Sequence, residues 1–334
     1  MKVYVTELLH PHAMEELAGF AEVHLASSTD EAVQTEEVVG MDAIISRGAR
    51  LYDSVIRAAA ASGTRLVVRH AAGLDTVNIE LCTKLGVAVC NCPGANANST
   101  AEQAVALALA ISKNIRSIDL AYRYGAFTLG KPLTARKEEL GFINHELMGK
   151  VAGVVGYGRI GRLVGEKMHY GFGMKIAAYD PVLCGRDGVL PDGGVWCPEL
   201  DELLAMSDIV FILAPLTADN HGMIGAHELE VMKESAFLVN DGRGELIDEP
   251  ALYEALRTKK IAGAALDMLA VEPPKKRHPF FDLDNIIVTP HCGSATVEAT
   301  EKLSLMAVDN VRIFFGGGSP EGWVNREQLA AIGV

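Results

Sequence analysis

The fold of this chain is decided by Lys150-Val151-Ala152-Gly153-Val154-Val155-Gly156-Tyr157-Gly158-Arg159-Ile160-Gly161. The first half of the stretch is a short apolar run typical of a buried strand, and the residues from Arg162 to His169 continue as a helix would. The glycine spacing alone carries little weight, because 33 of the 334 residues are glycine. A strand, a tight turn and a helix in this order give the spacing its meaning and predict a dinucleotide-binding unit.

Each glycine of the turn has a separate mechanical reason. Gly156 permits the turn, Gly158 lets the backbone approach a pyrophosphate, and Gly161 lets the helix pack on the strand. Free amides and the positive end of the helix dipole favour phosphate at the start of that helix. We therefore expect the cofactor pyrophosphate to be bound by Gly156, Gly158, Arg159, Ile160 and Gly161.

The identity of the dinucleotide is indicated by Asp180. It ends the second apolar run, Lys175–Tyr179, about 20 residues after the fingerprint, where a carboxylate bonds the adenosine ribose. The same carboxylate would repel a 2′-phosphate, and no arginine follows before Arg186. NAD is therefore predicted in preference to NADP.

The composition excludes several classes of protein. A length of 334 residues is typical of two domains, and the net charge of −13 with a single short basic run at Lys275–Arg277 argues against nucleic acid and anionic membranes as partners. The segment Met1–Glu7 reads poorly as a signal peptide, and the longest apolar run, Ala104–Ile111, is too short to span a bilayer. We expect a soluble, cytoplasmic protein.

The six cysteines predict neither disulfides nor a metal site. They are Cys82, Cys90, Cys92, Cys184, Cys197 and Cys292. Cys90 and Cys92 would share one face of a strand, yet two ligands do not make a tetrahedral site. We expect reduced, mostly buried thiols and no bound metal.

Alternating strand and helix patterns predict two parallel-sheet α/β domains, each Rossmann-like or flavodoxin-like. Before the fingerprint the strands are expected at Val3–Thr6, Ala21–Leu25, Ala43–Ser46, Leu66–Arg69 and Val87–Asn91, and after it at Ile209–Ala214, Ala236–Asn240, Gly263–Leu266 and Asn285–Thr289. The expected NAD-binding domain, 99–289, is inserted into a substrate domain formed by 1–98 and 290–334.

Two further helices are predicted. Ser99 is expected as the N-cap, with Glu102 at capping-box spacing, of an almost wholly apolar helix reaching about Asn114, buried between layers or between subunits. A second helix is expected over Glu298–Phe315. The tail beyond it should pack back on the first domain.

Three motifs follow predicted strands, where open α/β sheets bind ligands. They are Val239–Glu245, which contains Arg243; Ala265–Met268, followed by Val271-Glu272-Pro273; and Val288–Thr296, which contains His291. Taken one at a time, Arg243 could belong to a surface ion pair, Glu272 could be a solvated acid, and His291 could be an ordinary loop histidine. Together after a dinucleotide site they indicate catalysis. Further cofactor contacts are expected from Ala214, Pro215, Asp241, Gly242, Asp267 and Gly293.

These motifs resemble those of the D-isomer-specific 2-hydroxyacid dehydrogenases, most closely the 3-phosphoglycerate dehydrogenase and glyoxylate or hydroxypyruvate reductase branch. The likeness runs from about Leu66 to the tail and includes Arg69–Asp75, Pro93–Glu102, the fingerprint, Ser207–Val210, Pro215–Thr217 and the three strand-end motifs.

The resemblance implies reversible hydride transfer between NAD and a small 2-oxo acid, with Arg243, Glu272 and His291 as the catalytic set. His291 would donate a proton to the carbonyl oxygen during reduction. Glu272 would hold the imidazole and favour its charged form. Arg243 would bind the carboxylate and polarise the carbonyl, and Asp267 would face the nicotinamide.

The resemblance leaves the substrate open. Ala72 and Gly73 would bind a carboxylate oxygen through their amides. Arg69 and His70 would accept a second anionic group, as in phosphonopyruvate, unless Arg69 is a structural strand-end residue. A phosphate-linked arginine of the relatives falls on Ser46, which argues against phosphoglycerate. Phosphite dehydrogenases of the family carry a lysine at the position of Ala72, so Ala72 argues against phosphite as the substrate. Formate dehydrogenases carry a glutamine at the position of Glu272, so Glu272 argues against formate.

The resemblance also implies a homodimer, and it leaves one other class of function. A branch of this fold consists of NAD-sensing, corepressor-like binding proteins, which retain the same Arg, Glu and His. The absence of long disordered tails and the low basic content favour an enzyme over such a protein.

Overall fold

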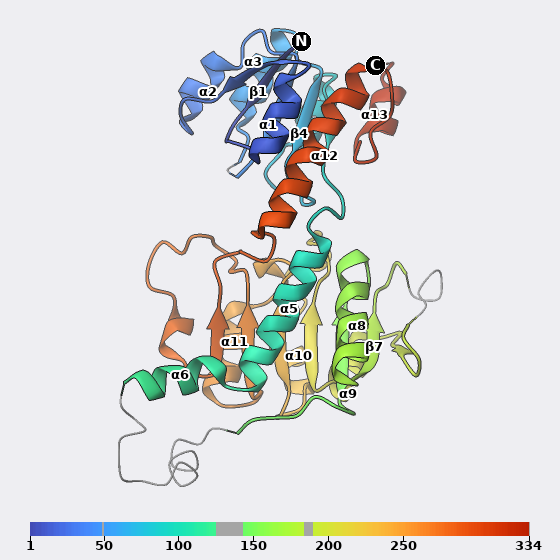
Figure 1. Ribbon diagram of the computed structural model, residues 1–334. Helices are drawn as coiled ribbons and strands as arrows, with labels where there is room; N and C mark the ends of the chain where they lie inside the picture. Colours follow the sequence, from blue (N-terminus) through green and yellow to red (C-terminus); the bar gives the residue numbers. More distant parts are fainter. Residues whose placement is uncertain (49, 125–142, 184–189, 334) are drawn as a thin grey trace. The chain divides into compact units, whose positions relative to one another are not determined.

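The computed structural model describes residues 1–48, 50–124, 143–183 and 190–333. Cys184 and Arg186, both used in the predictions above, lie outside the described residues. The chain forms two compact units (Figure 1). Unit 1 consists of Met1–Asn96 and Ser294–Val334, and unit 2 consists of Ala97–Gly293.

Unit 1 contains a five-stranded sheet in the order β2-β1-β3-β4-β5, with every pair parallel. Its strands are β1 (Lys2–Val5), β2 (Glu22–Leu25), β3 (Ala43–Ser46), β4 (Leu66–Arg69) and β5 (Ala88–Cys90). Its helices are α1 (Pro11–Ala18), α2 (Glu31–Glu37), α3 (Asp53–Ala61), α4 (Ile79–Lys84), α12 (Val297–Phe315) and α13 (Arg326–Ala331). This order is that of the flavodoxin-like doubly wound fold.

The sheet of unit 1 is covered on both faces because its strands are apolar at nearly every position. One face packs against α1 and α12, with Leu17 and Val308 among the buried side chains. The other face packs against α3 and α4, with Ile56 and Leu81 buried. The helix expected at Glu298–Phe315 is therefore part of the core of unit 1.

The tail after α12 pairs with the edge strand β5. Cys90 forms an antiparallel bridge with Trp323, and the amide of Val89 donates to the side-chain oxygen of Asn325 at 2.9 Å. The Asn325 side-chain amide in turn donates to Val87 O and Thr83 Oγ1. The tail therefore covers backbone groups that an edge strand would otherwise expose.

Unit 2 contains a seven-stranded, all-parallel sheet in the order β12-β11-β10-β9-β6-β7-β8. Its strands are β6 (Val151–Val155), β7 (Lys175–Tyr179), β8 (Val195–Trp196), β9 (Ile209–Ile212), β10 (Phe237–Asn240), β11 (Gly263–Leu266) and β12 (Ile286–Val288). Its helices are α5 (Ala97–Ser112), α6 (Ile115–Arg123), α8 (Arg159–Phe172), α9 (Leu200–Met206), α10 (Ala226–Val231), α11 (Glu249–Arg257) and two 3₁₀ turns, Gly244–Leu246 and Pro279–Asp282. The strand order reverses between β6 and β9, as in a Rossmann fold.

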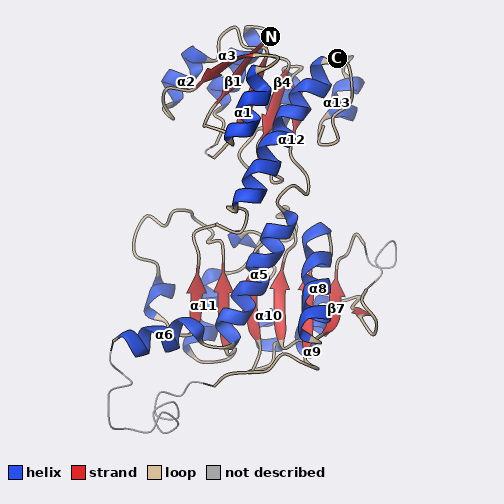
Figure 2. Cartoon of the chain, in the orientation of Figure 1, coloured by secondary structure: helices blue, strands red, loops and turns tan. Residues whose placement is uncertain are grey.

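Helices lie against the strands of this sheet (Figure 2), and two separate hydrophobic cores flank it. Alternate residues of each strand enter each core: Val154 and Phe211 pack with α5 and α8, whereas Val155 and Ile212 pack with α9, α10 and α11. This alternation along strands that are buried on both faces explains why they read as continuous apolar runs. The two parallel sheets confirm the predicted fold class.

The start of α5 corrects one prediction. Ser99 does not cap the helix, which begins two residues earlier at Ala97. The Ser99 hydroxyl is buried and donates to the carbonyl of Gly293 at 2.6 Å, so a tertiary contact within unit 2 occupies the group that was expected to cap. Glu102 instead accepts from Asn98 Nδ2 at 2.8 Å.

The unit boundary after β12 lies at 293/294, whereas the sequence analysis placed it at 289/290. Backbone and side-chain hydrogen bonds from Asp267 hold residues 291–293 in unit 2. Among the described residues, no helix is long and apolar enough to cross a bilayer.

Candidate active site

The fingerprint turn joins β6 to α8 in unit 2. Gly156 has a φ of +88°, and a Cβ added to it would lie 2.6 Å from the amide nitrogen of Ala214 after β9. A Cβ on Gly161 would lie 2.2 Å from the carbonyl oxygen of Gly156, so the helix packs too closely on the turn for a side chain. A Cβ on Gly158 would meet no atom within 4 Å. Gly158 therefore borders open space at the N-terminus of α8, as an approaching pyrophosphate requires.

Asp180 lies beside this turn at the end of β7. Its Oδ2 accepts from the amide of Tyr157 at 3.0 Å, and its Oδ1 accepts from the amides of Val182 and Leu183 at 3.0 Å each. These bonds fix a carboxylate next to the glycines. The glycine cradle and the neighbouring Asp180 fit a dinucleotide whose ribose hydroxyls are unphosphorylated.

The loops that follow β9 and β10 lie next to each other at the carboxyl ends of the parallel strands. A Cβ on Gly242 would lie 3.0 Å from the carbonyl oxygen of Ala214, so the two loops are packed in contact. The carbonyl of Pro215 accepts from Asn220 Nδ2 at 2.8 Å, which holds the loop after β9.

Glu272 and His291 form a direct pair. Glu272 Oε2 accepts from His291 Nδ1 at 2.8 Å, and Glu272 Oε1 accepts from the amide of Leu269 at 3.0 Å. The side chains are 33% and 45% exposed, so the pair is open to a small molecule on one side. Because the carboxylate holds Nδ1, the other ring nitrogen, Nε2, is the one available to a substrate.

Arg243 follows β10, the strand next to β11. Its Nη1 donates to the carbonyl of Gly242 at 2.7 Å and lies 3.9 Å from Met268 Sδ. Arg243 is half-buried. The predicted catalytic residues thus follow three adjacent parallel strands of unit 2, and a hydrogen bond joins two of them.

The loop that carries His291 is held by Asp267. The amide of His291 donates to the Asp267 carbonyl at 2.7 Å, and His291 has a φ of +50°. Asp267 Oδ1 accepts from Thr289 Oγ1 and the Cys292 amide, and Oδ2 accepts from the Gly293 amide at 2.8 Å. A left-handed backbone is unfavourable for histidine and persists only where the surroundings impose it. Asp267 supplies those surroundings.

Asp241 lies next to Asp267 and is 3% exposed. Burial, followed by the negative charge of Asp267, raises the pKa of Asp241 to about 8, although Arg243 opposes the shift. Asp241 therefore holds a proton at neutral pH. A charged group that is buried without compensation usually takes up a proton in this way.

In unit 1, Arg69 and His70 lie in the interior. Arg69 is 8% exposed, and its guanidinium donates to the carbonyls of Ser46 at 3.3 Å and Gly48 at 3.0 Å. His70 Nε2 lies 2.8 Å from Ser304 Oγ on α12. Burial, aided by the charges of Arg47 and Arg69, lowers the pKa of His70 to about 4. These contacts favour the structural reading of Arg69.

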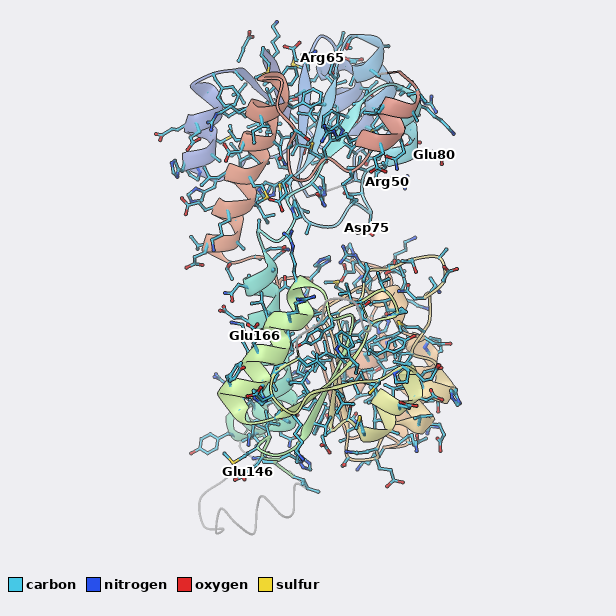
Figure 3. All side chains as sticks on the ribbon, turned by 90° about the vertical axis from the view of Figure 1, so that its right-hand side faces the viewer. Arg50, Arg65, Asp75, Glu80, Glu146 and Glu166 are labelled. Carbon is cyan, nitrogen blue, oxygen red and sulfur yellow. The ribbon has the colours of Figure 1, made fainter. Side chains whose placement is uncertain are left out.

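The backbone amides of Ala72 and Gly73 differ from the side chains of Arg69 and His70 in their hydrogen bonding. The loop is half-buried, and Asn91 Nδ2 donates to the carbonyl of Ala72 at 2.6 Å. Within the described ranges, no residue accepts a hydrogen bond from the amide of Ala72 or Gly73. The loop continues to Asp75, which is exposed and labelled in Figure 3. It therefore offers two adjacent backbone donors, as a carboxylate requires.

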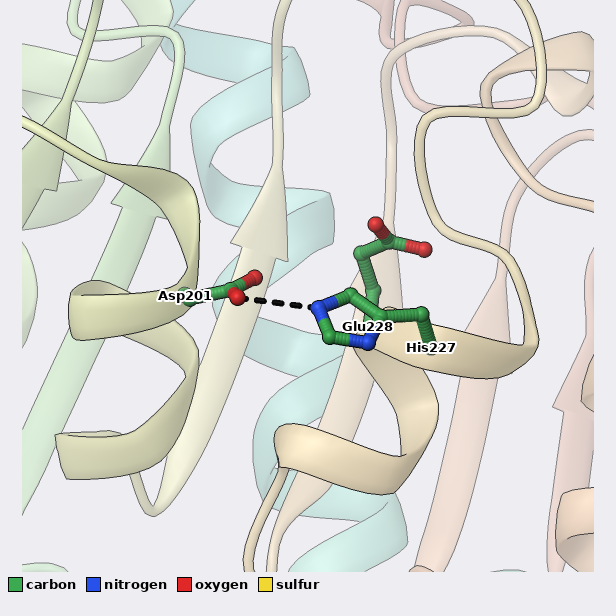
Figure 4. Close-up of side chains that lie close together, drawn as sticks. All are labelled: Asp201, His227 and Glu228. Carbon is green, nitrogen blue, oxygen red and sulfur yellow. Dashed lines mark hydrogen bonds and ion pairs between the residues drawn. The ribbon is translucent and has the colours of Figure 1, made fainter.

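A separate cluster in unit 2 contains potential metal ligands. Asp201 on α9 and His227 and Glu228 on α10 bring their ligand atoms within 4.8 Å of one another (Figure 4). The His227 ring nitrogen lies 2.9 Å from Asp201 Oδ2, and this bond raises the pKa of His227. Glu228 accepts from the Gly225 amide at 2.9 Å and caps α10. Asp201 and His227 are exposed, and the geometry is that of an ion pair beside a helix cap.

The sequence analysis missed Gln103, which belongs to the site. Its side-chain amide donates to Asp267 Oδ1 at 3.3 Å and Thr289 Oγ1 at 3.2 Å. The signal was the spacing of Ser99 and Gln103, which are four residues apart on this helix and therefore share a face. Glu249 was also missed: it accepts from the Ala270 amide at 2.8 Å and so holds the loop before Glu272.

Comparisons with known proteins follow the same division into units. Residues 105–293 match the family model described as D-isomer specific 2-hydroxyacid dehydrogenase, NAD binding domain. Glyoxylate reductase of Thermococcus litoralis is 32% identical over 338 residues, covering 99% of this chain and 98% of that protein. D-3-phosphoglycerate dehydrogenase of Archaeoglobus fulgidus is 34% identical over 93% of this chain, which spans only 56% of that relative.

The solved structures agree with these relatives. The TT0316 protein from Thermus thermophilus superposes with a TM-score of 0.85 at 30% identity, covering 97% of this chain and 100% of that one. These comparisons give no support to the corepressor-like alternative. The family match also confirms NAD as the cofactor. The chain belongs to the D-isomer-specific 2-hydroxyacid dehydrogenases.

Proposed function

We propose that this protein interconverts a small 2-oxo acid and the corresponding D-2-hydroxy acid with NAD. The observation that carries the proposal is the 2.8 Å bond between Glu272 and His291 at the strand ends of the unit that matches an NAD-binding domain. A histidine held by a carboxylate and open on its other nitrogen is suited to proton transfer.

Each residue of the set has a distinct task. His291 Nε2 gives a proton to the carbonyl oxygen in reduction and takes it back in oxidation. Glu272 orients the ring and balances its positive charge. Arg243 binds the carboxylate and stabilises negative charge on the reacting oxygen. NAD, when bound, supplies or accepts the hydride.

Within this proposal, unit 1 is the substrate domain and unit 2 the NAD domain. The amides of Ala72 and Gly73 bind a carboxylate oxygen, which is supported by their lack of acceptors among the described residues. Gly156, Gly158, Gly161 and the start of α8 bind the pyrophosphate, and Asp180 binds the ribose. The open space beside Gly158 supports this assignment.

The candidate substrates are glyoxylate, hydroxypyruvate and phosphohydroxypyruvate, of which the last carries two anionic groups. The contacts of Arg69 with backbone carbonyls support an acid with one anionic group over one with two, such as phosphonopyruvate. The burial of Ser46, where phosphoglycerate relatives carry an arginine, points the same way. Glyoxylate and hydroxypyruvate are therefore the first substrates to test.

We also propose a cytoplasmic homodimer. A groove between α5 and α8 is lined by Val105, Tyr170 and Phe172, and Tyr170 is 74% exposed. A second copy of the chain is the occupant that the family resemblance implies. The molar mass in solution tests this, and Tyr170→Lys should shift it toward the monomer.

The decisive experiment follows NADH consumption across a panel of glyoxylate, hydroxypyruvate, phosphohydroxypyruvate, phosphonopyruvate and branched 2-oxo acids. His291→Ala should lower kcat by about 10³-fold while NAD affinity, measured by calorimetry, stays close to that of the wild type. His227→Ala is the matched control, because His227 also lies beside a carboxylate in unit 2 but outside the site. Absence of turnover on every acid would overturn the proposal.

A further inference from the structure

Two buried carboxyl groups lie side by side behind the proposed active site. Asp241 directly follows β10 and Asp267 directly follows β11, and the register pairs Asn240 with Leu266 immediately before them. Asp241 is 3% exposed and Asp267 is fully buried. A Cβ on Gly293 would lie 3.0 Å from Asp241 Oδ1 and 3.1 Å from Asp267 Oδ2, so both groups border the same glycine.

The two carboxyl groups have unequal partners. The oxygens of Asp267 accept from Gln103, Thr289, Cys292 and Gly293. Both oxygens of Asp241 are inaccessible and have no hydrogen-bond donor among the described residues. Asp267 is therefore the group whose surroundings stabilise an anion, and Asp241 is the group that needs a proton.

Once it is protonated, Asp241 can donate. The Asp267 carboxyl group lies beside it, and its negative charge helps to keep the proton on Asp241. The other ionisable groups facing the pair are Arg243, whose charge favours ionisation of Asp241, and the Cys292 thiol, whose pKa is raised by burial and by Asp267. The surroundings therefore favour a protonated Asp241 beside the hydrogen-bonded carboxyl group of Asp267.

The pair lies on the nicotinamide side of the sheet. The fingerprint follows β6 and Asp180 follows β7, so the adenosine half of a dinucleotide extends toward β7. The other half must extend across the switch point toward β9, β10 and β11, where the two aspartates are. The nicotinamide ring is cationic in NAD⁺ and uncharged in NADH, so a change of charge on the pair acts differently on the two forms.

We propose that Asp241 is a positioning residue that shares one proton with Asp267, and that loss of this proton favours bound NAD⁺ over bound NADH. The proposal rests on NAD being the cofactor of the proposed function. As a neutral acid, Asp241 keeps Asp267 oriented toward the His291 loop. Binding of the cationic ring promotes release of the proton, and by linkage a rise in pH tightens NAD⁺ more than NADH.

The test uses cofactor binding without substrate. Dissociation constants of NAD⁺ and NADH are measured for the wild type and Asp241→Asn from about pH 6 to about pH 9. The asparagine amide still donates to Asp267, but the charge of the pair no longer changes. In the wild type, NAD⁺ affinity should increase relative to NADH by about three- to tenfold over this range. In Asp241→Asn the ratio should stay flat, and in the control Asp201→Asn it should follow the wild type.

A second measurement needs no variant. Calorimetry in two buffers of different ionisation enthalpy counts the protons released on binding. Near pH 8, NAD⁺ should release a fraction of a proton that NADH does not, and Asp241→Asn should abolish the difference. Equal proton release for the two cofactors, or the same pH dependence with and without Asp241, would overturn the inference. Failure of the substrate panel would leave these binding results intact, so the two proposals fail separately.

Discussion

The two parallel sheets place ionisable residues at their strand ends in opposite ways. In unit 2, Glu272 and His291 pair through their side chains and remain 33% and 45% exposed. In unit 1, Arg69 and His70 are buried, and Arg69 bonds backbone carbonyls. A position at the end of a strand is therefore insufficient to identify a catalytic side chain. The exposure of the side chain and the type of its partner distinguish the candidates of unit 2 from the buried residues of unit 1.

Among the variants that test this comparison, Arg243→Ala should have the largest effect. Arg243→Ala should lower kcat/KM for glyoxylate or hydroxypyruvate by about 10²- to 10³-fold, because the charge on the carboxylate and on the reacting oxygen loses its partner. Steady-state kinetics check this. Arg257→Ala, on the exposed face of α11, is the control and should change nothing measurable. If Arg243→Ala lowered only the thermal stability, Arg243 would have a structural role, and the strand ends of the two units would no longer differ in this respect.

Glu272→Gln should lower kcat by about 10- to 10²-fold, because the amide keeps a contact with His291 but no longer balances its charge. Binding of NADH should be unchanged, since the substitution alters the partner of a side chain that handles the proton. Glu254→Gln, in an exposed ion pair of α11, is the matched control. Equal rates for Glu272→Gln and the wild type would remove Glu272 from the catalytic set.

Asp241 should make unit 2 less stable as pH rises. Its pKa is about 8 in the folded state against an ordinary value of 3.8, so between these values the folded state binds a proton that the unfolded chain lacks. Stability then falls by up to about 1.4 kcal/mol per pH unit and levels off above pH 8. Asp241→Asn should therefore raise Tm at pH 8 by more than at pH 5. A constant difference in Tm would contradict the shift.

His70 should have the reverse effect on unit 1. Its pKa is about 4 when folded against 6.5 ordinarily, so as pH falls between these values the unfolded chain takes up the proton and stability decreases. His70→Gln should reduce this loss at pH 5 and have little effect at pH 8. Thermal unfolding at the two values checks it. Together with Asp241→Asn, the variant sharpens the comparison, because the two units respond to pH with opposite sign.

The smallest kinetic effect is expected for Arg69→Ala. Loss of its bonds to Ser46 and Gly48 should cost about 1–3 kcal/mol of stability, while kcat/KM should fall equally for acids with one and two anionic groups. A selective loss with phosphonopyruvate would instead give Arg69 a direct role in binding. In that case the strand ends of both units would carry residues that act on the substrate.

The fold was largely predictable because the strands are short apolar runs ended by glycine or polar residues. Ala43–Ser46, Leu66–Arg69, Lys175–Tyr179 and Gly263–Leu266 have the same bounds in the sequence analysis and in the structure. The start of α5 was wrong because the Ser99 hydroxyl bonds Gly293, a residue far along the chain that local capping rules cannot see.

The sequence analysis named candidate side chains for the site but not the groups that hold them in place. The strand-end motifs named Glu272 and His291 before any geometry, and the family match confirms NAD. The burial of His70 depends on α12, which returns from the other end of the chain and contacts the ring through Ser304. The proton on Asp241 depends on a neighbouring strand. Both are consequences of tertiary packing, which short-range patterns do not contain.

The discontinuity of unit 1 has a consequence for the order of synthesis. Its core includes Leu303, Ala307, Val308 and Val311 of α12, which leave the ribosome after all of unit 2. We expect the continuous residues 97–293 to fold first, while residues 1–96 wait with an uncovered sheet face. A nascent chain arrested once residue 293 has left the ribosome should show a protease-resistant unit 2 and a cleavable N-terminal segment. Chaperone demand should then concentrate on the segment that is made first and completed last.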